Sequence, residues 1–432
     1  MKVFRLLFAS ALACVCTLPS LGQVIVCPQD DRPCVIITGK AGEKAADMII
    51  EGAIDYYYRT HVTGFQQSSM PRFVITGQDH RFMLGIGGFV NFRTAYDFEG
   101  AVQDLDFETF DIPIPGDYRT RQDLFMDAST SRLFFKAIAN VGKLGPIVTY
   151  IETDFRGTPN GNLRLRQAYI SFKGFLFGRN VTTFCDLDAS PTTIDFQGPN
   201  AYNFNFNQMI RYTHTFGDKW TIGAALEMPQ SSITETRDLV RTTQRLPDLP
   251  VYAQFSWNRK RSHVRVSGIF RDLYYHDLAT NKNESAFGWG VQFSGNVNIN
   301  KRVILFSQFT YGQGITPYLQ DITGAGLDLV PNPNNMSKLQ TLPMMGWFAA
   351  AQINLSRRVF CSGGFSQVRV NERNDYHAAD VYRIANYAFG NIFWKITPSM
   401  QTAIEYLYGT RKNMGGAKNH ANRVQAMIQY NF

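Results

Sequence analysis

The stretch RVQAMIQYNF, residues 423–432, decides the fold. Val424, Ala426, Ile428, Tyr430 and Phe432 share one parity, while the other parity carries Arg, Gln, Met, Gln and Asn. Because successive side chains of a β-strand point to opposite faces, the stretch predicts a strand with one apolar and one largely polar face. A membrane β-barrel needs both faces, since one meets lipid and the other meets water.

The same period of two recurs along the chain, in residues 82–98, 220–228, 251–258, 263–271 and 287–294. A soluble β-sandwich also alternates, so the connections decide between the two architectures. Short polar turns are expected at 140–145, 173–174, 217–219, 258–261, 298–301, 356–358 and 397–399. Longer loops are expected at 99–122, 157–162, 186–206, 229–249, 272–284, 313–342, 371–379 and 411–420. The strict alternation of short and long connections predicts an all-β fold, an antiparallel transmembrane barrel of 16 strands.

The alternation slips in three segments, residues 163–172, 360–370 and 380–394. Each slip requires either a β-bulge or an outer face that protein covers instead of lipid. A neighbouring subunit would supply such a cover.

Composition supports a membrane barrel and excludes other classes. Aromatic residues make up 14% and charged residues only 18%, so the chain can bury too much apolar surface to be disordered. Beyond residue 22 no run of about 18 apolar residues occurs, which excludes a helical membrane protein. The net charge of +8 is scattered along alternating strands, and this pattern argues against a nucleic-acid-binding patch.

Three regions are expected along the chain. Residues 1–22 are typical of a signal peptide, with basic Lys2 and Arg5 before an apolar core; a buried helix or lipid attachment at Cys14 are the alternatives. Residues 23–80 predict a short periplasmic extension, not a plug, with one amphipathic helix over 42–59. Cys27 and Cys34 flank a turn-rich segment, and export favours a disulfide between them. Residues 81–432 form the barrel.

Residues 178–186 (GRNVTTFCD), 193–199 (TIDFQGP) and 208–213 (QMIRYT) resemble the DcaP-like trimeric porins. The opening FVNF at 89–92 and the terminal Phe432 are also similar to that family. The resemblance implies a homotrimeric channel in the outer membrane of a Gram-negative bacterium, embedded in lipid and lipopolysaccharide and passing small anions such as dicarboxylates. It also implies that the barrel-assembly machinery reads Phe432. One departure is the short N-terminal region, where family members often carry a coiled coil.

A barrel of this size is too wide for side chains alone to fill, so its inward residues set selectivity. Strand parity predicts these pore-lining basic residues: Arg93, Arg132, Lys136, Arg164, Arg166, Arg211, Arg265, Arg271 and Arg423. The inward acidic residues are fewer: Asp97, Glu152, Asp154, Glu227 and Glu405. Loop 186–206 carries Asp186, Asp188 and Asp195, and we expect it to form a constriction that faces the arginines and creates a transverse field.

Other functions find little support in the sequence. No histidine lies in a metal or nucleophile motif, and no cofactor, metal site or catalytic residue is predicted; His214 would be the one lipid-facing histidine open to a phospholipase. Gly85, Gly87 and Gly88 lie inside a strand and precede no helix, so they form no phosphate loop. The remaining alternative to a channel is a surface adhesin or receptor that acts through the long loops.

Overall fold

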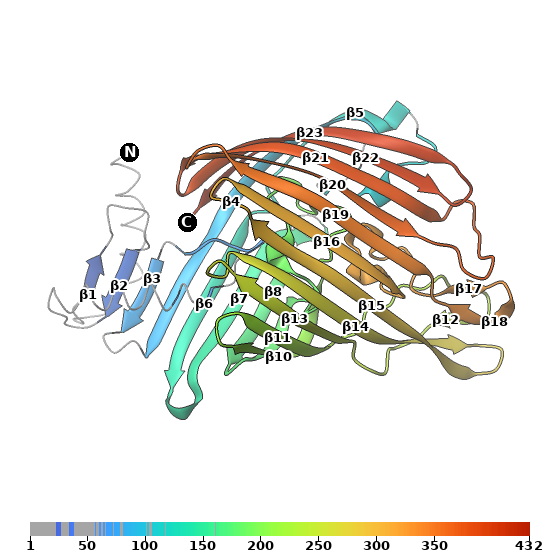
Figure 1. Cartoon of the computed structure of the whole chain (residues 1–432), viewed down its shortest axis with the longest axis horizontal. Coiled ribbons are helices and arrows are strands. Elements are labelled where there is room, and N and C mark those ends of the chain that lie inside the picture. Colours follow the sequence, from blue (N-terminus) through green and yellow to red (C-terminus); the bar gives the residue numbers. More distant parts are fainter. Residues whose placement is uncertain are drawn as a thin grey trace.

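The computed structural model describes residues 23–26, 34–38, 57, 60, 61, 64, 66–71, 73–77 and 81–432 except 101, 103–105, 117 and 160. Its main body is a closed antiparallel β-barrel of 16 strands (Figure 1). The wall consists of β4 (Phe82–Glu99), β5 (Arg121–Asp127), β6 (Arg132–Val141), β7 (Gly145–Gly157), β8 (Asn162–Phe172), β9 (Phe175–Val181), β10 (Phe206–Phe216), β11 (Trp220–Glu227), β13 (Leu249–Trp257), β14 (Ser262–Asp277), β15 (Lys282–Asn298), β16 (Val303–Gln313), β19 (Pro343–Asn354), β20 (Val359–Val370), β21 (Tyr382–Thr397), β22 (Met400–Asn413) and β23 (Lys418–Asn431).

Two details of pairing close the barrel. β5 and β6 pair with opposite ends of β4 and together make a single interrupted strand. β23 pairs with β4 on its other edge, and the backbone of Phe432 exchanges two hydrogen bonds with Gly88. The last residue of the chain therefore completes the seam.

The alternation of side chains follows the expectation from sequence. On β23, Ile428 and Tyr430 are 40% and 53% exposed on the outer face, whereas Arg423 and Gln425 are 0% and 1% exposed inside. His214 lies on the outer face of β10, where its ring centroid is 4.5 Å from that of Phe216. Apolar side chains thus cover the outside of the wall, and polar side chains line its inside.

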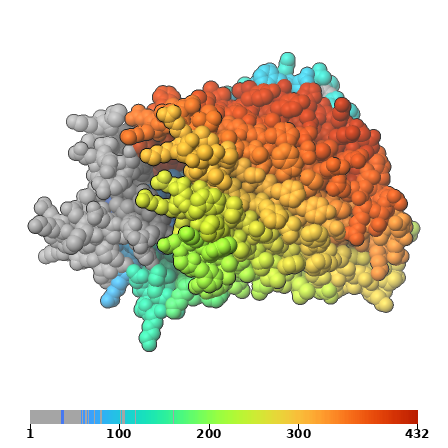
Figure 2. All heavy atoms as spheres, in the orientation of Figure 1, coloured from blue at the N-terminus to red at the C-terminus, as the bar shows by residue number. Residues whose placement is uncertain are grey.

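The connections at the two ends of the barrel differ in length. All seven predicted tight turns lie at one end, here called the tight-turn end, within one or two residues of their expected positions; several project in Figure 2. Two predicted loops, 272–284 and 411–420, are wrong in length, because β14 and β15 leave only residues 278–281 between them and β22 and β23 leave only 414–417. At these two places the strands of the hairpins β14–β15 and β22–β23 continue beyond the belt of exposed apolar residues.

The parity slips have two causes. Register shifts occur between Glu152 and Thr153 opposite β8, and between Tyr382 and Ile384 on β21, and they confirm the expected bulges. β20 keeps its register with both neighbours, but its inward Val368 and Val370 pack on loops inside the barrel. Apolar residues there point inward because protein, not water, fills that part of the lumen.

Short elements complete the fold. β12 (Leu239–Arg241) extends the wall along β14, and β17 (Val330–Asn332) and β18 (Asn335–Gln340) form a separate hairpin. β1 (Gln23–Val26), β2 (Cys34–Thr38) and β3 (Phe73–Gly77) form a small sheet that joins the tight-turn end of β4 (Figure 1). Within the described ranges, no helix is long and apolar enough to cross a membrane.

The N-terminal region differs from the expectation in one respect. The predicted signal peptide, Cys27, and the predicted helix except the helical Tyr57 fall outside the described residues, so the Cys27–Cys34 disulfide stays a prediction. Tyr57, Gln66 and Ser68, however, contact inward side chains of β6, β7 and β8, so part of the extension enters the lumen.

Candidate functional site

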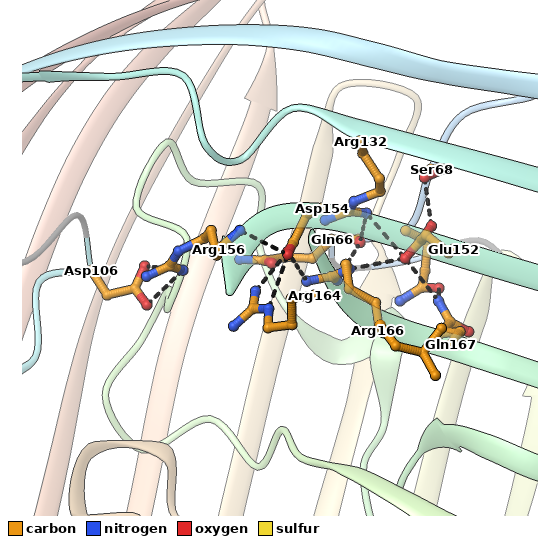
Figure 3. Close-up of polar contacts among 12 residues, drawn as sticks. Gln66, Ser68, Asp106, Arg132, Glu152, Asp154, Arg156, Arg164, Arg166 and Gln167 are labelled. Carbon is orange, nitrogen blue, oxygen red and sulfur yellow. Dashed lines mark hydrogen bonds and ion pairs between the residues drawn. The ribbon is translucent and has the colours of Figure 1, made fainter. Parts of the chain in front are cut away.

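Five arginines converge on one side of the lumen, and we call them the arginine cluster; Figure 3 labels four of them, and Arg93 is the fifth. They come from four neighbouring strands: Arg93 on β4, Arg132 on β6, Arg156 on β7, and Arg164 and Arg166 on β8. Antiparallel pairing places inward residues of adjacent strands side by side, so alternation alone brings these side chains together. Four of the five are predicted pore-lining residues, and Arg156 is an addition that its position at the end of β7 had concealed.

Three carboxylates pair with the cluster. Glu152 binds Arg166 at 2.9 Å and approaches Arg132 at 3.7 Å. Asp154 binds Arg164 at 2.6 Å and Arg166 at 3.4 Å. The third, Asp106 in the first long loop, pairs with Arg156 at 2.9 Å.

Arg93 is the exception in the cluster. The Nε atom of Arg93 donates to Asn91 Oδ1 at 3.1 Å, and its Nη1 atom has no hydrogen-bond partner among the described residues. Arg93 as a whole is only 6% exposed. Within the part of the chain that the structure describes, four guanidinium groups of the cluster therefore share three carboxylates in ion pairs, and the fifth, that of Arg93, forms none. The cluster carries a local excess of positive charge.

An aromatic ring of the loop between β9 and β10 (residues 182–205, the inner loop) faces this cluster. The guanidinium carbons of Arg93, Arg156 and Arg166 lie 5.6, 4.7 and 5.3 Å from the centroid of the Phe196 ring. Each distance is within the range of a cation–π contact. Phe196 thus holds three arginines in place without neutralising them.

The inner loop lies inside the barrel, and wall carboxylates anchor it. Glu227 of β11 accepts hydrogen bonds from Thr182 Oγ1 at 2.7 Å and Thr183 N at 2.6 Å. Glu405 of β22 accepts from the amides of Ile194 and Asp195 at 3.0 and 2.8 Å. Both glutamates are 1% exposed, so they serve the loop and not the open lumen.

The predicted opposition between loop aspartates and arginines is only partly correct: it is wrong for Asp186, whereas Asp188 and Asp195 line a cavity with Arg93 and Arg132. Asp186 lies 2.8 Å from His263 Nε2 and accepts from Ser294 at 2.6 Å, both on the far wall; Asp195 accepts from Tyr387 at 2.8 Å. A buried carboxylate needs donors, and Asp186 finds them in His263 and Ser294 while Asp195 finds one in Tyr387. Of the three aspartates only Asp188 is exposed, and it lines the cavity described below.

The surroundings of two of these loop carboxyl groups shift their pKa values in opposite directions. Burial alone would raise the pKa of Asp186, but the hydrogen bond and charge of His263 lower the pKa below its usual range. Burial, with the charges of Asp106 and Glu405, raises the pKa of Asp195 to about 7. Asp195 is therefore partly protonated near neutral pH.

The remaining predicted arginines and lysine point inward but differ in surroundings. Arg271 is sealed between Asp248 and Asp328 at 3.1 Å from each, and Arg423 binds Asp97 at 2.6 Å. Both side chains are fully buried beneath loops and do not face open lumen. Arg211 and Arg265 donate to carbonyls at the start of the inner loop, and Lys136 donates to Tyr57 O at 3.2 Å.

A second loop, residues 314–342, also folds inward, and the sequence reading did not anticipate it. Its Ile315, Leu319 and Ile322 pack with Phe184 and Ala201 of the inner loop in one apolar cluster. The sequence of this loop does contain a signal for inward packing, because a long loop exposed to solvent would not carry so many aliphatic residues. The two loops together restrict the lumen from the long-loop end.

A cavity of about 410 Å³ remains between the inner loop and the arginine cluster. Arg93 and Arg132 line one side of it, and Asp188 and Asp195 line the other. Amide and hydroxyl side chains supply the rest of its polar surface: Gln66, Gln67, Asn91, Thr130, Ser190, Thr192, Thr193, Gln401 and Gln429. Such a lining suits a hydrated polar solute better than an apolar one.

Comparison with known proteins places the chain in a family. The family model described as DcaP outer membrane protein matches residues 77–432. The crystal structure of the outer membrane channel DcaP of Acinetobacter baumannii is similar at 21% identity and a TM-score of 0.71, over 81% of this chain and 97% of that one. OmpT of Vibrio cholerae (11%, TM-score 0.53, 82% and 98%) and an anion-selective porin from Comamonas acidovorans (10%, 0.53, 81% and 100%) share the fold. Among curated proteins, none matches the sequence.

Proposed function

Because the chain belongs to the DcaP outer membrane protein family, whose channels lie in the Gram-negative outer membrane, we propose that it is a passive diffusion channel selective for small hydrophilic anions. Dicarboxylates are the solute class that the cluster geometry favours. The observation that carries this preference is the arginine cluster, in which five guanidinium groups meet three carboxylates and, among the described residues, Arg93 forms no ion pair.

The physical basis is electrostatic focusing. A narrow aqueous passage between low-dielectric walls strengthens the field of uncompensated charges and raises the local concentration of the opposite ion. Arg93 retains a free donor, and Arg132 lies beside it on the cavity wall. Two carboxylates on a short carbon chain can each approach one such guanidinium fork, while water keeps the binding weak enough for passage.

Glu227, Glu405 and Asp186 do not line this cavity and therefore do not cancel the field there. Glu227 and Glu405 are buried under the inner loop and accept its backbone amides. Asp186 is held by His263. The inward charges therefore separate into anchoring carboxylates on one wall and solute-facing guanidinium groups on the other.

The quaternary state is proposed to be a homotrimer. On the outer face, Gln367 donates to Asn386 at 2.8 Å, and Asn386 donates to Thr410 at 2.9 Å. Side-chain amides facing lipid are unfavourable, and a neighbouring subunit would cover them. Gln367 and Asn386 lie in residues 360–370 and 380–394, two segments where the sequence required either a bulge or a protein-covered outer face. Lipid and lipopolysaccharide around the trimer, and recognition of Phe432 by the assembly machinery, belong to the same proposal.

The arrangement of the loops favours a channel over an adhesin or receptor. An adhesin would present its long loops outward. Here each of three long loops buries a residue inside the molecule: Phe107 in the first long loop, Tyr202 in the inner loop and Leu319 in loop 314–342. These loops shape the lumen, so their contacts serve permeation.

Reversal potentials in planar bilayers test the proposal. With a salt gradient at low ionic strength, the wild-type protein should prefer anions, and Arg93→Gln should lower the anion-to-cation permeability ratio by roughly two- to threefold. Arg357→Gln, in an exposed tight turn, is the matched control and should leave the ratio unchanged. The difference should shrink near 1 M salt, where screening lengths fall to about 3 Å. A cation-preferring or non-selective wild-type channel would overturn the proposal.

A further inference from the structure

Several inward side chains at the tight-turn end of the barrel are apolar. Met83 on β4, Ile138 on β6 and Val148 on β7 are 1%, 0% and 6% exposed, and they form one cluster with Tyr57 and Val74. In a lumen filled with water these side chains would be exposed at an unfavourable free energy. The wall of this barrel therefore requires a cover from inside, and the N-terminal region supplies it.

The glycines of β4 make room for that cover. A Cβ atom added to Gly85 would lie 2.2 Å from the hydroxyl oxygen of Tyr57, and one added to Gly87 would lie 2.8 Å from Pro71 Cα. The intervening Ile86 points outward and is 39% exposed, so both glycines face the lumen. The paired glycines, which form no phosphate loop, provide a floor on which Tyr57 and Pro71 rest.

Polar contacts fix the rest of the segment to the arginine cluster. Gln66 O accepts from Arg132 Nη1 at 2.5 Å and from Arg166 Nη2 at 3.3 Å. Ser68 Oγ donates to Glu152 at 2.6 Å, and Gln67 Oε1 accepts from Gln167 at 2.9 Å (Figure 3 draws Gln66 and Ser68 against β6–β8). A backbone carbonyl thus occupies two guanidinium donors that an anionic solute would otherwise use.

The other side of the segment meets the inner loop. A Cβ atom added to Gly64, whose φ is +114°, would lie 2.8 Å from Leu187 Cβ. Gly64, Gln66 and Gln67 also line the 410 Å³ cavity. The segment therefore lies between the two structures that define the pore, the arginine cluster and the inner loop.

From these contacts we infer that Tyr57, Thr60, His61, Gly64 and Gln66–Pro71 form a resident pore strap that sets the conductance of the channel. The strap narrows the passage beside the inner loop and holds part of the arginine cluster through Gln66 O. The inference rests on the proposed channel function, but not on the preference for anions. Displacing the strap widens the passage and frees donors on Arg132 and Arg166.

A matched pair of glycine substitutions tests the strap. Gly85→Val fills the floor under Tyr57 and should raise the single-channel conductance by about twofold, since ion flow follows the open cross-section. Gly268→Val is the control, because Gly268 lies on the outer face of β14, where an added Cβ atom meets its nearest neighbour only at 3.7 Å, and its conductance should equal that of the wild type. Equal conductance for folded Gly85→Val and wild-type channels would overturn the strap.

A labelling experiment keeps the inference testable even where Gly85→Val fails to fold. In Gln67→Cys, a positively charged methanethiosulfonate reagent added to open channels should reduce the conductance in steps, because residue 67 lines the passage. Wild-type protein and Asp218→Cys, in the turn after β10, should not respond. Labelling of Gln67→Cys that leaves the current unchanged overturns the strap, whereas absence of any channel in wild-type protein overturns the channel function instead.

Discussion

The two sides of the barrel lumen use inward charge in different ways. On β4–β8, arginines and carboxylates form ion pairs with guanidinium groups in excess, and Arg93 and Arg132 reach a cavity. On β11 and β22, Glu227 and Glu405 accept backbone amides and hold the inner loop. Both sets obey the same strand parity. The comparison teaches that an inward charge becomes a pore charge only where the segments packed on it leave a cavity beside it.

The largest expected effect is a loss of stability in the arginine cluster. Arg164 and Arg166 both lie on β8, and comparing them separates the contribution of a buried ion pair from that of a partly exposed one. Arg166 is 1% exposed and is bound to Glu152 and Asp154, so Arg166→Ala removes one ion-pair partner from each of two buried carboxylates. The free energy of unfolding should fall by about 3–5 kcal/mol. Arg164 has a side chain that is 38% exposed, and Arg164→Ala should cost less than about 1 kcal/mol.

Urea unfolding of the refolded barrel in detergent micelles measures both values. Equal losses for the two variants would show that the buried pair is not the stabilising contact. Because Arg166 is structural, a double alanine variant at 164 and 166 would not report on selectivity alone. Arg93→Gln, which leaves no ion pair broken, is the cleaner probe of the pore.

An intermediate effect is expected on the opposite wall. Glu405→Ala removes the acceptor of the Ile194 and Asp195 amides and leaves two buried N–H groups unpaired. Unfolding free energy should fall by about 1–3 kcal/mol, and single-channel recordings should become noisier as the inner loop loosens. Asp218→Ala, in an exposed turn, is the control. Quiet wild-type-like currents in Glu405→Ala would mean that the loop is held by other contacts.

Sequence alone predicted the wall of the barrel well. Alternation in residues 423–432 and the regular spacing of tight turns are local features, and they suffice for the strand number and for which side chains face inward. The loop lengths at 272–284 and 411–420 were wrong, because alternation continues past the membrane and does not mark its edge. Arg93 was identified as inward for the same local reason.

What parity could not predict was the packing of loops and strap against the wall. Arg271 and Arg423 look like Arg93 in sequence, yet Asp328 from a loop seals the first, and the second is paired with Asp97 beneath a loop. Those contacts depend on where residues far apart in the chain meet. Inward Met83 and Ile138, and the paired glycines at 85 and 87, were nevertheless signals that protein fills this end of the lumen.

The smallest expected effect concerns the proton on Asp195, between the two walls. Burial, with the charges of Asp106 and Glu405, raises its pKa to about 7, whereas an unfolded aspartate titrates near about 4. The folded state therefore favours the protonated carboxyl. This contribution to stability is fully present below about pH 4 and is lost as the pH rises through about 7.

The melting temperature of the wild-type protein should accordingly fall by about 2 °C between about pH 5.5 and about pH 8 through this group. Asp195→Asn keeps a neutral acceptor for the amide of Phe107, which now donates at 3.1 Å, and it cannot ionise. Its melting temperature should vary less over the same window. If thermal scans give both proteins the same pH slope, Asp195 does not titrate there, and the attachment of the inner loop to its anchoring wall is insensitive to pH near neutrality.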